Sequence, residues 1–312
     1  MRLAAVQDAP VFLDRDASVA KAVGLIEEAA AHGAQVIGFP EGFIPGHPGW
    51  GELHRFDDRF IALNARLFAN AVEVPSPAVD ALRSACRDAG IAAVVGVCER
   101  LAGTTGTLFN TQLHLTERGE LAGRHQKYVP TIGERLVHGP GQSGSVNSFA
   151  AQGITISGLI CGENSNPLAQ YAAAVAYPTV HVASWPQHFS PSLAMAPVVD
   201  VVPRALAYSL KCFVINAVTT VAPEMVAAYG YDDGAEYLRG DGIGARAAVI
   251  GPAGQTLARA EDDAPQIVYA DVDPDDVVAA KFVHDVAGHY NRPELFSHLV
   301  NGHPQHREGS ES

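Results

Sequence analysis

The chain has 312 residues, of which 47% are hydrophobic and 18% charged. This composition can supply a large buried core and argues against a disordered protein. Lys and Arg number 21 against 34 Asp and Glu, which gives a formal net charge of −13. Nucleic acids and anionic membranes would repel this charge, so neither is an expected partner. No stretch approaches the roughly 18–20 apolar residues of a membrane span.

Cysteine use favours a reducing compartment. The four cysteines are too few for a disulfide framework and have no CxxC or Cys/His metal-ligand spacing; they are Cys86, Cys98, Cys161 and Cys212. The N-terminal sequence MRLAAVQDAP reaches Asp8 after a short apolar run, unlike a signal peptide. We therefore expect a soluble cytoplasmic protein.

Apolar periodicity predicts alternating strands and helices. Residues 3–6, 17–31 and 35–39 have the patterns of a strand, a helix and a strand, the order of a βαβ unit. Further strands are predicted at 91–98, 108–116, 121–127, 154–160, 179–184, 213–218, 245–250, 255–260 and 267–272. Further helices are predicted at 76–89, 167–176, 198–210 and 274–281. This mixture of βα units and hairpins predicts two sheets covered by helices.

Nothing in the sequence resembles a linker between domains. We expect one domain over residues 1–296 and a polar C-terminal tail over residues 297–312, which ends in NGHPQHREGSES. The chain contains no repeat of solenoid length and no low-complexity tract, so an α/β architecture with a single core is the simplest reading.

Two residues directly follow predicted buried strands, where functional groups gather in α/β sheets. Glu41 follows VIGFP, and a partly desolvated carboxylate there would suit a general base, although a Glu in a surface turn is more common. Cys161 follows ITISGLI and precedes the polar sequence GEN, so its thiol could be presented as a nucleophile at a strand-to-helix elbow. Buried cysteines more often act as small hydrophobes, and Cys98 also ends a predicted strand.

A lysine ends another predicted strand. Lys127, in GRHQKYVPT, could stabilise a developing anion, but a lone lysine is usually a solvated surface charge. Glu134, in GERLVHGPG, is either a neighbour of this lysine or part of an exposed loop. Spacing alone does not bring Glu41, Lys127 and Cys161 together, so the pattern by itself predicts only an α/β hydrolase candidate.

Together these segments resemble the nitrilase superfamily of carbon-nitrogen hydrolases, and its nitrilase branch in particular. FPEGFIPGHP resembles the glutamate motif of the family, and GRHQKYVPTIGERLVHGPG resembles its lysine motif. GLICGENSNPLAQYAAAVAYPTVHVASWP resembles the cysteine motif with the strand that follows it, and DVAGHYNRPELF resembles the closing segment of nitrilases. The resemblance runs from about Arg2 to Phe296, nearly the whole chain.

The resemblance implies a four-layer α-β-β-α sandwich of two mixed sheets covered by helices, with Glu41, Lys127 and Cys161 in one pocket. Glu41 would act as the base, Cys161 would attack a nitrile carbon, and Lys127 would stabilise charge at the former nitrile nitrogen. Thioimidate and thioester intermediates would lead to a carboxylic acid and ammonia, with Glu134 orienting water or substrate. No metal or organic cofactor would be needed. An amidase or carbamoyl hydrolase using the same site is the alternative.

The chain departs from the family in two places. Many nitrilases carry Trp after the nucleophile, whereas this chain has Gly162, so substrate size cannot be carried over. Tyr128 follows the lysine where Leu is frequent, and it would cover the pocket or pack beneath it. Trp185 is expected in the pocket wall or in plain core packing. Glu163 and Asn164 are the remaining expected pocket residues, and Asn164 could instead hold the elbow by hydrogen bonds.

The resemblance also implies a homo-oligomer, either a dimer or a larger assembly. The small residues of predicted helix 167–176 would allow close contact with a second copy, and they would equally suit packing on the helix's own sheet. A non-catalytic scaffold role has no support in the sequence, because all three catalytic positions are filled.

Overall fold

The strands form two mixed sheets that share one point of contact. The computed structural model describes the chain except for residues 54–55, 187–193, 230–237, 239–243 and 302–312. In spatial order, the first sheet contains β12, β1, β2, β3, β4 and β5, which span Gln266–Asp271, Arg2–Gln7, Val36–Gly38, Ala92–Arg100, Leu108–Leu115 and Leu121–Gln126. The second contains β11, β10, β9, β8, β7 and β6, which span Thr256–Arg259, Ala248–Ile250, Phe213–Val218, Val180–Trp185, Ile154–Ile160 and Ser148–Ala151. β1 meets β9 at the residue pair Gln7–Val218.

Each sheet has parallel strands in its middle and antiparallel strands at its edges. β1, β2 and β3 are parallel to one another, as are β7, β8 and β9. Helices connect these parallel strands; they are α1 (Arg15–Ala31), α3 (Pro77–Ala89), α4 (Pro167–Ala174) and α5 (Met195–Leu210). The strand, helix and strand order predicted from apolar periodicity is therefore present in both halves of the chain.

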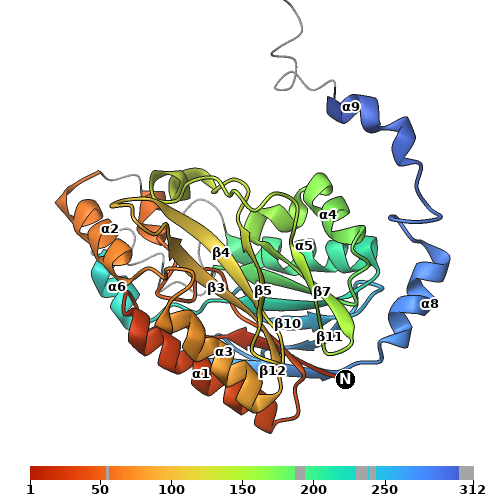
Figure 1. Ribbon diagram of the computed structural model, residues 1–312, viewed down its shortest axis with the longest axis horizontal. Coiled ribbons are helices and arrows are strands. Elements are labelled where there is room, and N and C mark those ends of the chain that lie inside the picture. The colour runs from red at the N-terminus through yellow and green to blue at the C-terminus, as the bar shows by residue number, and fades with distance from the viewer. Residues whose placement is uncertain (54–55, 187–193, 230–237, 239–243, 302–312) are drawn as a thin grey trace, which may run out of the picture.

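Alternate residues of the central strands face two different apolar layers. In β1, Leu3 and Ala5 pack in the core shared with the second sheet, whereas Ala4 and Val6 pack with residues of α1 and α3. Figure 1 shows α1 and α3 along one side of the strands, and α4 and α5 on the other side. This helix, sheet, sheet, helix order confirms the predicted α-β-β-α sandwich.

A buried glutamine joins the two sheets. Gln112 in β4 donates from Nε2 to Ser184 Oγ in β8 at 2.7 Å and to the carbonyl of Leu159 in β7 at 3.2 Å. Ser184 Oγ in turn donates to the carbonyl of Phe39 at 2.8 Å, which returns the link to the first sheet. A Cβ atom at Gly158 would lie 2.4 Å from Gln112 Oε1, so only glycine leaves room for this side chain.

Local sequence accounts for the ends of the predicted helices. The side chain of Asp14 accepts a hydrogen bond from the backbone N–H of Ala17, which caps the start of α1. Gly90 ends α3 with a φ of +66°, a left-handed conformation that glycine adopts without strain. Both signals were visible in the sequence, and the helix boundaries lie close to the predicted ones.

Besides the 3-10 helices and a short helix in the C-terminal tail, three of the described elements were not predicted. They are α2 (Asp58–Asn70), β6 and α6 (Pro223–Tyr229). α2 buries Phe60, Leu63 and Leu67, a spacing typical of an amphipathic helix, so its signal was present in the sequence. β6 is a short edge strand that pairs with β7 alone among the described residues, and so short a segment carries little periodicity.

After β12 the chain leaves the sandwich. α8 (Asp275–Val283) and α9 (Ser297–Asn301) belong to an arm that extends away from the body of the molecule (Figure 1). Part of the predicted polar tail is therefore helical, while residues 302–312 lie outside the described residues. The assignment of residues 1–296 to one domain stays a prediction. None of the helices that the structure describes combines the length and apolar character needed to cross a membrane.

Replacing Gln112 by Ala should lower the free energy of unfolding by about 2–4 kcal/mol. The variant leaves a cavity between the sheets and removes the donor to Ser184 Oγ. Urea unfolding followed by circular dichroism measures the change. Gln142→Ala, at an exposed position, is the matched control and should change stability by less than about 0.5 kcal/mol. Equal unfolding midpoints for Gln112→Ala and the wild type would contradict the proposed link between the sheets.

Candidate active site

The ends of three strands carry the three predicted catalytic residues. Glu41 follows β2, Lys127 follows β5, and Cys161 is the first residue after β7. All three are buried, with exposed fractions of 1%, 2% and 4% respectively. The charges of Glu41 and Lys127 both act on the thiol of Cys161. The first sheet thus supplies the charged groups and the second sheet supplies the thiol, on the side where the two sheets face each other.

Lys127 is held between two carboxylates. Its Nζ lies 2.8 Å from Glu41 Oε1 and 2.6 Å from Glu134 Oε2. Asn110 Nδ2 donates to the same two side chains, at 2.6 Å to Glu41 Oε1 and 2.7 Å to Glu134 Oε1. The four side chains therefore form a closed ring of hydrogen bonds in which an ammonium and an amide each bridge both acids.

The two carboxylates differ in how completely they are satisfied. Glu134, in the 3-10 helix η2 (Ile132–Leu136), also accepts hydrogen bonds from His138 Nδ1 at 3.0 Å and from the backbone N–H of Thr131 at 2.9 Å. Each oxygen of Glu134 thus has two donors. Both donors to Glu41 reach Oε1, and its buried Oε2 has no hydrogen-bond partner among the described residues. Oε2 of Glu41 is therefore the oxygen available to take a proton.

The pKa values of the two acids shift in opposite directions. Burial raises the pKa of Glu41, and the charge of Glu134 adds to this, although Lys127 opposes it. Burial also acts to raise the pKa of Glu134, but Lys127 and His138 outweigh it and hold that pKa well below its usual range. Burial acts to lower the pKa of Lys127, yet the two carboxylates raise it well above its ordinary value. Lys127 and Glu134 therefore stay ionised, while Glu41 is suited to exchange a proton.

Cys161 opens a strained turn. It has a φ of +50° and is the first residue of the 3-10 helix η3 (Cys161–Ser165). Burial raises the pKa of its thiol well above the ordinary value, the charge of Glu41 raises it further, and Lys127 lowers it in part. The thiol is consequently protonated at neutral pH, and a base must remove its proton as it attacks.

Asn164 holds this turn against the second sheet. Its Nδ2 donates to the carbonyls of Leu159 at 3.1 Å and Cys161 at 3.0 Å. Its Oδ1 lies 3.0 Å from Nε2 of His181 in β8, whose Nδ1 lies 2.7 Å from Ser157 Oγ in β7. The hydrogen bonds of Asn164, which the sequence placed either in the pocket or at the elbow, therefore go to the backbone around the thiol and to His181 in the neighbouring strand.

The other expected pocket residues have different surroundings. Gly162 is exposed, and a Cβ atom there would meet Thr131 Oγ1 at an ordinary 3.7 Å, so the position beside the thiol is open. Tyr128 is half-buried and packs edge-on against His125, with ring centroids 4.8 Å apart. Trp185 at the end of β8 is fully buried, and its Nε1 has no hydrogen-bond partner among the described residues. Glu163 is buried, and its carboxylate receives protein donors.

Sequence analysis missed three residues of this site. Asn110 lies in the fully buried strand LFNTQLHL, where its polar neighbours in an otherwise apolar segment were a usable signal. His138 contacts Glu134 and lies 3.2 Å from Cys98 Sγ through its Nε2. His47 Nδ1 lies 3.7 Å from Glu41 Oε1, and burial lowers the pKa of His47 to about 3, so this imidazole is neutral.

A metal ion in this cluster would compete with Lys127. Glu41, His47 and Glu134 offer ligand atoms that lie within 4.8 Å of one another. Lys127 Nζ lies within 2.8 Å of an oxygen of each acid, and its positive charge would repel a cation placed among them. The residues present therefore fit an ammonium better than a metal ion as the partner of the two carboxylates.

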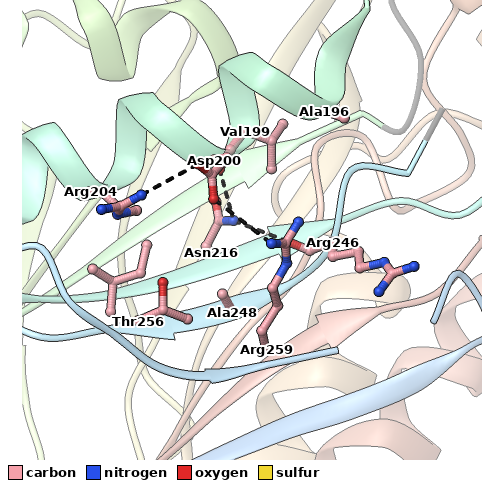
Figure 2. A pocket seen from close by; sticks show the side chains of 10 residues that line it. Ala196, Val199, Asp200, Arg204, Asn216, Arg246, Ala248, Thr256 and Arg259 are labelled. Carbon is pink, nitrogen blue, oxygen red and sulfur yellow. Dashed lines mark hydrogen bonds and ion pairs between the residues drawn. The ribbon is translucent and has the colours of Figure 1, made fainter. Parts of the chain in front are cut away.

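A small cavity lies on the outer face of the second sheet. Figure 2 shows it between α5 and strands β10 and β11, with Asp200, Arg204 and Arg259 around it. Asp200 lies 3.5 Å from Arg204 Nη1 and 3.9 Å from Arg259 Nη1, so these charges largely compensate one another. The cavity volume of about 10 Å³ is close to that of a single water molecule. The cavity is lined by none of the predicted catalytic residues.

Known sequences resemble the chain over almost its full length. The sequence profile of the carbon-nitrogen hydrolase family matches residues 2–282. The chain is 36% identical over 306 residues to an aliphatic nitrilase from Rhodococcus rhodochrous, an alignment that covers 95% of this chain and 81% of that protein. It is 32% identical over 311 residues to a nitrilase from Pseudomonas syringae pv. syringae strain B728a, covering 97% of this chain and 90% of that protein.

Solved structures share the fold. An amidase from Nesterenkonia sp. AN1 in complex with acrylamide superposes with a TM-score of 0.67 at 20% identity, over 96% of this chain and 97% of that chain. The same amidase, with the acetamide moiety of fluoroacetamide added covalently at its active site cysteine, superposes with a TM-score of 0.64 over 89% and 92%. At this identity the likeness concerns the fold alone. The profile match and the nitrilase relatives show that the chain belongs to the carbon-nitrogen hydrolase family, in the nitrilase branch of the nitrilase superfamily.

Proposed function

We propose that this chain hydrolyses a nitrile to the corresponding carboxylic acid and ammonia, with Cys161 as the nucleophile. The proposal rests on one observation. The buried Lys127 ammonium is shared by two carboxylates whose pKa values shift in opposite directions, and the charges of these three groups act on the thiol of Cys161. The 36% identity to an aliphatic nitrilase supports a nitrile as the small-molecule substrate. The chain is accordingly a hydrolase that acts on carbon-nitrogen bonds other than peptide bonds.

In the first step, Glu41 takes the thiol proton while the sulfur of Cys161 attacks the nitrile carbon. A bond forms between sulfur and carbon, and one π bond of the nitrile becomes a lone pair on nitrogen. The Lys127 ammonium stabilises that developing negative charge, and the nitrogen then takes the proton from Glu41 to give a thioimidate. The unpartnered Oε2 of Glu41 is the atom suited to carry the proton.

In the second stage, water adds to the thioimidate carbon and gives up a proton to Glu41. The nitrogen takes this proton and becomes an amine, and Glu41 then transfers the proton of the new hydroxyl group to that amine. The carbon-nitrogen bond breaks as the carbonyl forms, and ammonia leaves a thioester on Cys161. A second water molecule adds in the same way and releases the carboxylic acid, and the sulfur recovers its proton. Two water molecules are consumed for each nitrile, and Glu41 ends in its starting state.

Glu134 acts in this scheme as the counter-ion of Lys127. Both of its oxygens are occupied by donors, and its lowered pKa keeps it ionised throughout the reaction. Sequence analysis proposed that Glu134 orients water or substrate. The saturation of its hydrogen bonds favours instead a role in keeping Lys127 charged and in place.

Cys161→Ala should reduce ammonia release by at least about 1,000-fold across aliphatic nitriles, aromatic nitriles and cyanide, because the nucleophile is lost. Ammonia release from each nitrile and from its matching amide measures the effect and separates the two candidate activities. Cys86→Ala is the matched control, since Cys86 lies in α3 and packs in the core between the first sheet and its helices, away from the site; it should keep activity within about twofold. Faster turnover of the amides than of the nitriles would assign the chain as an amidase instead.

The acid limb of the pH profile of kcat/KM should report the pKa of Glu41. As a base, Glu41 works in its ionised form, so kcat/KM falls as pH falls through its pKa, and burial places that fall above the pH of an ordinary glutamate. Glu134→Gln removes a negative charge that raises the pKa of Glu41. The acid limb should therefore move to lower pH while kcat decreases, because Lys127 loses a partner. A shift to higher pH would contradict Glu41 as the titrating base.

We further propose a homo-oligomer. Large apolar side chains are exposed on α4, on α5 and along the C-terminal arm; they include Leu168, Val175, Tyr177, Val201, Tyr208, Val278, Phe282, Val283, Tyr290, Leu295, Phe296 and Leu299. Large exposed apolar side chains are common in protein interfaces, and association of copies would remove these side chains from water. A cytoplasmic location is proposed with it, supported by the four free cysteines.

Sedimentation at micromolar concentration should show species heavier than the 32.8 kDa chain. Phe282→Glu, which places a charge at a side chain that is 85% exposed in the single chain, should shift the distribution towards smaller species if the arm takes part in association. Glu120→Gln, on an exposed turn of the first sheet, is the control that should leave the distribution unchanged. A wild-type sample that contains only the 32.8 kDa species would contradict the oligomer.

A further inference from the structure

One carboxylate binds the backbone on both sides of the reacting pair. Glu163 Oε1 accepts a hydrogen bond from the backbone N–H of Tyr128 at 2.5 Å, and Oε2 accepts one from the backbone N–H of Ile160 at 2.9 Å. Tyr128 directly follows Lys127, and Ile160 directly precedes Cys161. Glu163 therefore connects the peptide groups that adjoin the ammonium and the thiol.

A third donor strengthens this connection. Nε2 of His125 lies 2.8 Å from Glu163 Oε2, and a carboxylate can only accept there, so the imidazole donates. His125 is fully buried in β5, two residues before Lys127. Glu163 thus has two contacts with the strand end that carries the lysine and one with the strand end that carries the cysteine. A buried carboxylate with three donors is held in one geometry.

The connection joins two strands that are not paired with each other. β5 lies in the first sheet and β7 in the second, and these strands are not paired in the described strand order. The relative position of their ends therefore depends on side chains that lie between them. The turn at Cys161 also has the strained φ of +50°, a conformation that persists only where its surroundings hold it.

We infer that Glu163 is a positioning residue that sets the distance between Lys127 Nζ and Cys161 Sγ, an inference that rests on the proposed function of that pair. Sequence analysis placed Glu163 in the substrate pocket. Its two oxygens instead receive three hydrogen bonds from this chain, so its contribution reaches the substrate through the lysine and the cysteine. Asn164 in the same turn differs, because its bonds run to β7 and β8 and leave the lysine segment untouched.

Glu163→Gln tests this inference, because the amide replaces one acceptor oxygen by an NH₂ group that cannot accept from an N–H donor. We expect kcat to fall by about 10- to 100-fold, the effect of a small misplacement of reacting groups, with KM within about twofold of wild type. Alkylation of Cys161 by iodoacetamide should also require a higher pH, because the ammonium that lowers the thiol pKa has moved away. Since alkylation requires no nitrile, this readout holds even if the proposed nitrile hydrolysis fails.

Matched variants separate positioning from general damage. Glu163→Asp retains both acceptor oxygens and should recover part of kcat and of the alkylation profile. His125→Gln weakens one of the three donors and should give a smaller change in the same direction; it carries the test if Glu163→Gln does not fold. Glu120→Gln is the exposed Glu-to-Gln control. A raised KM with unchanged kcat would assign Glu163 to substrate contact, and a wild-type kcat and alkylation profile in the folded variants would also overturn the inference.

Discussion

The proposed active site depends on a single buried ammonium that two carboxylates share. Removing three charged groups from water is costly, and the cost is offset only where nearly every donor and acceptor has a partner. Lys127 and Glu134 meet that condition together with Asn110 and His138, so they remain ionised as a pair. Glu41 carries the remaining negative charge, and burial raises its pKa. The thiol of Cys161, whose pKa is also raised by burial, keeps its proton until a substrate is present.

The sandwich buries the reacting groups. Glu41 and Lys127 come from the first sheet and Cys161 from the second, so these groups meet where the two sheets face each other, shielded from bulk solvent. The sheets have only the pair Gln7–Val218 as backbone contact between them in the described strands. Buried polar side chains such as Gln112 and Glu163 therefore contribute to the alignment of the two halves, in addition to the apolar core.

Periodicity predicted most strands and helices because each is a local pattern, but the site could not be assembled from local patterns. Glu41 and Lys127 are separated by 86 positions, and only a family resemblance placed them together. Asn110 was missed because its partners depend on the register of β4 against β3, which pairs it with Cys98 and which no local pattern encodes. The role of Glu163 depends likewise on which backbone N–H groups of a distant segment face it. Local sequence patterns therefore did not predict the buried polar contacts between segments that are distant in the chain.

The unpartnered Oε2 of Glu41 has a consequence for selectivity along the reaction path. Oε2 of Glu41 has no donor among the described residues, so an N–H or O–H group of a reacting species that reaches it gains a hydrogen bond without displacing one from the protein. A nitrile carries no N–H, whereas the imine, amine and attacking water that follow it all carry hydrogens to donate. The site is therefore better matched to the species formed during turnover than to the molecule that enters, which is the condition under which binding energy accelerates a reaction.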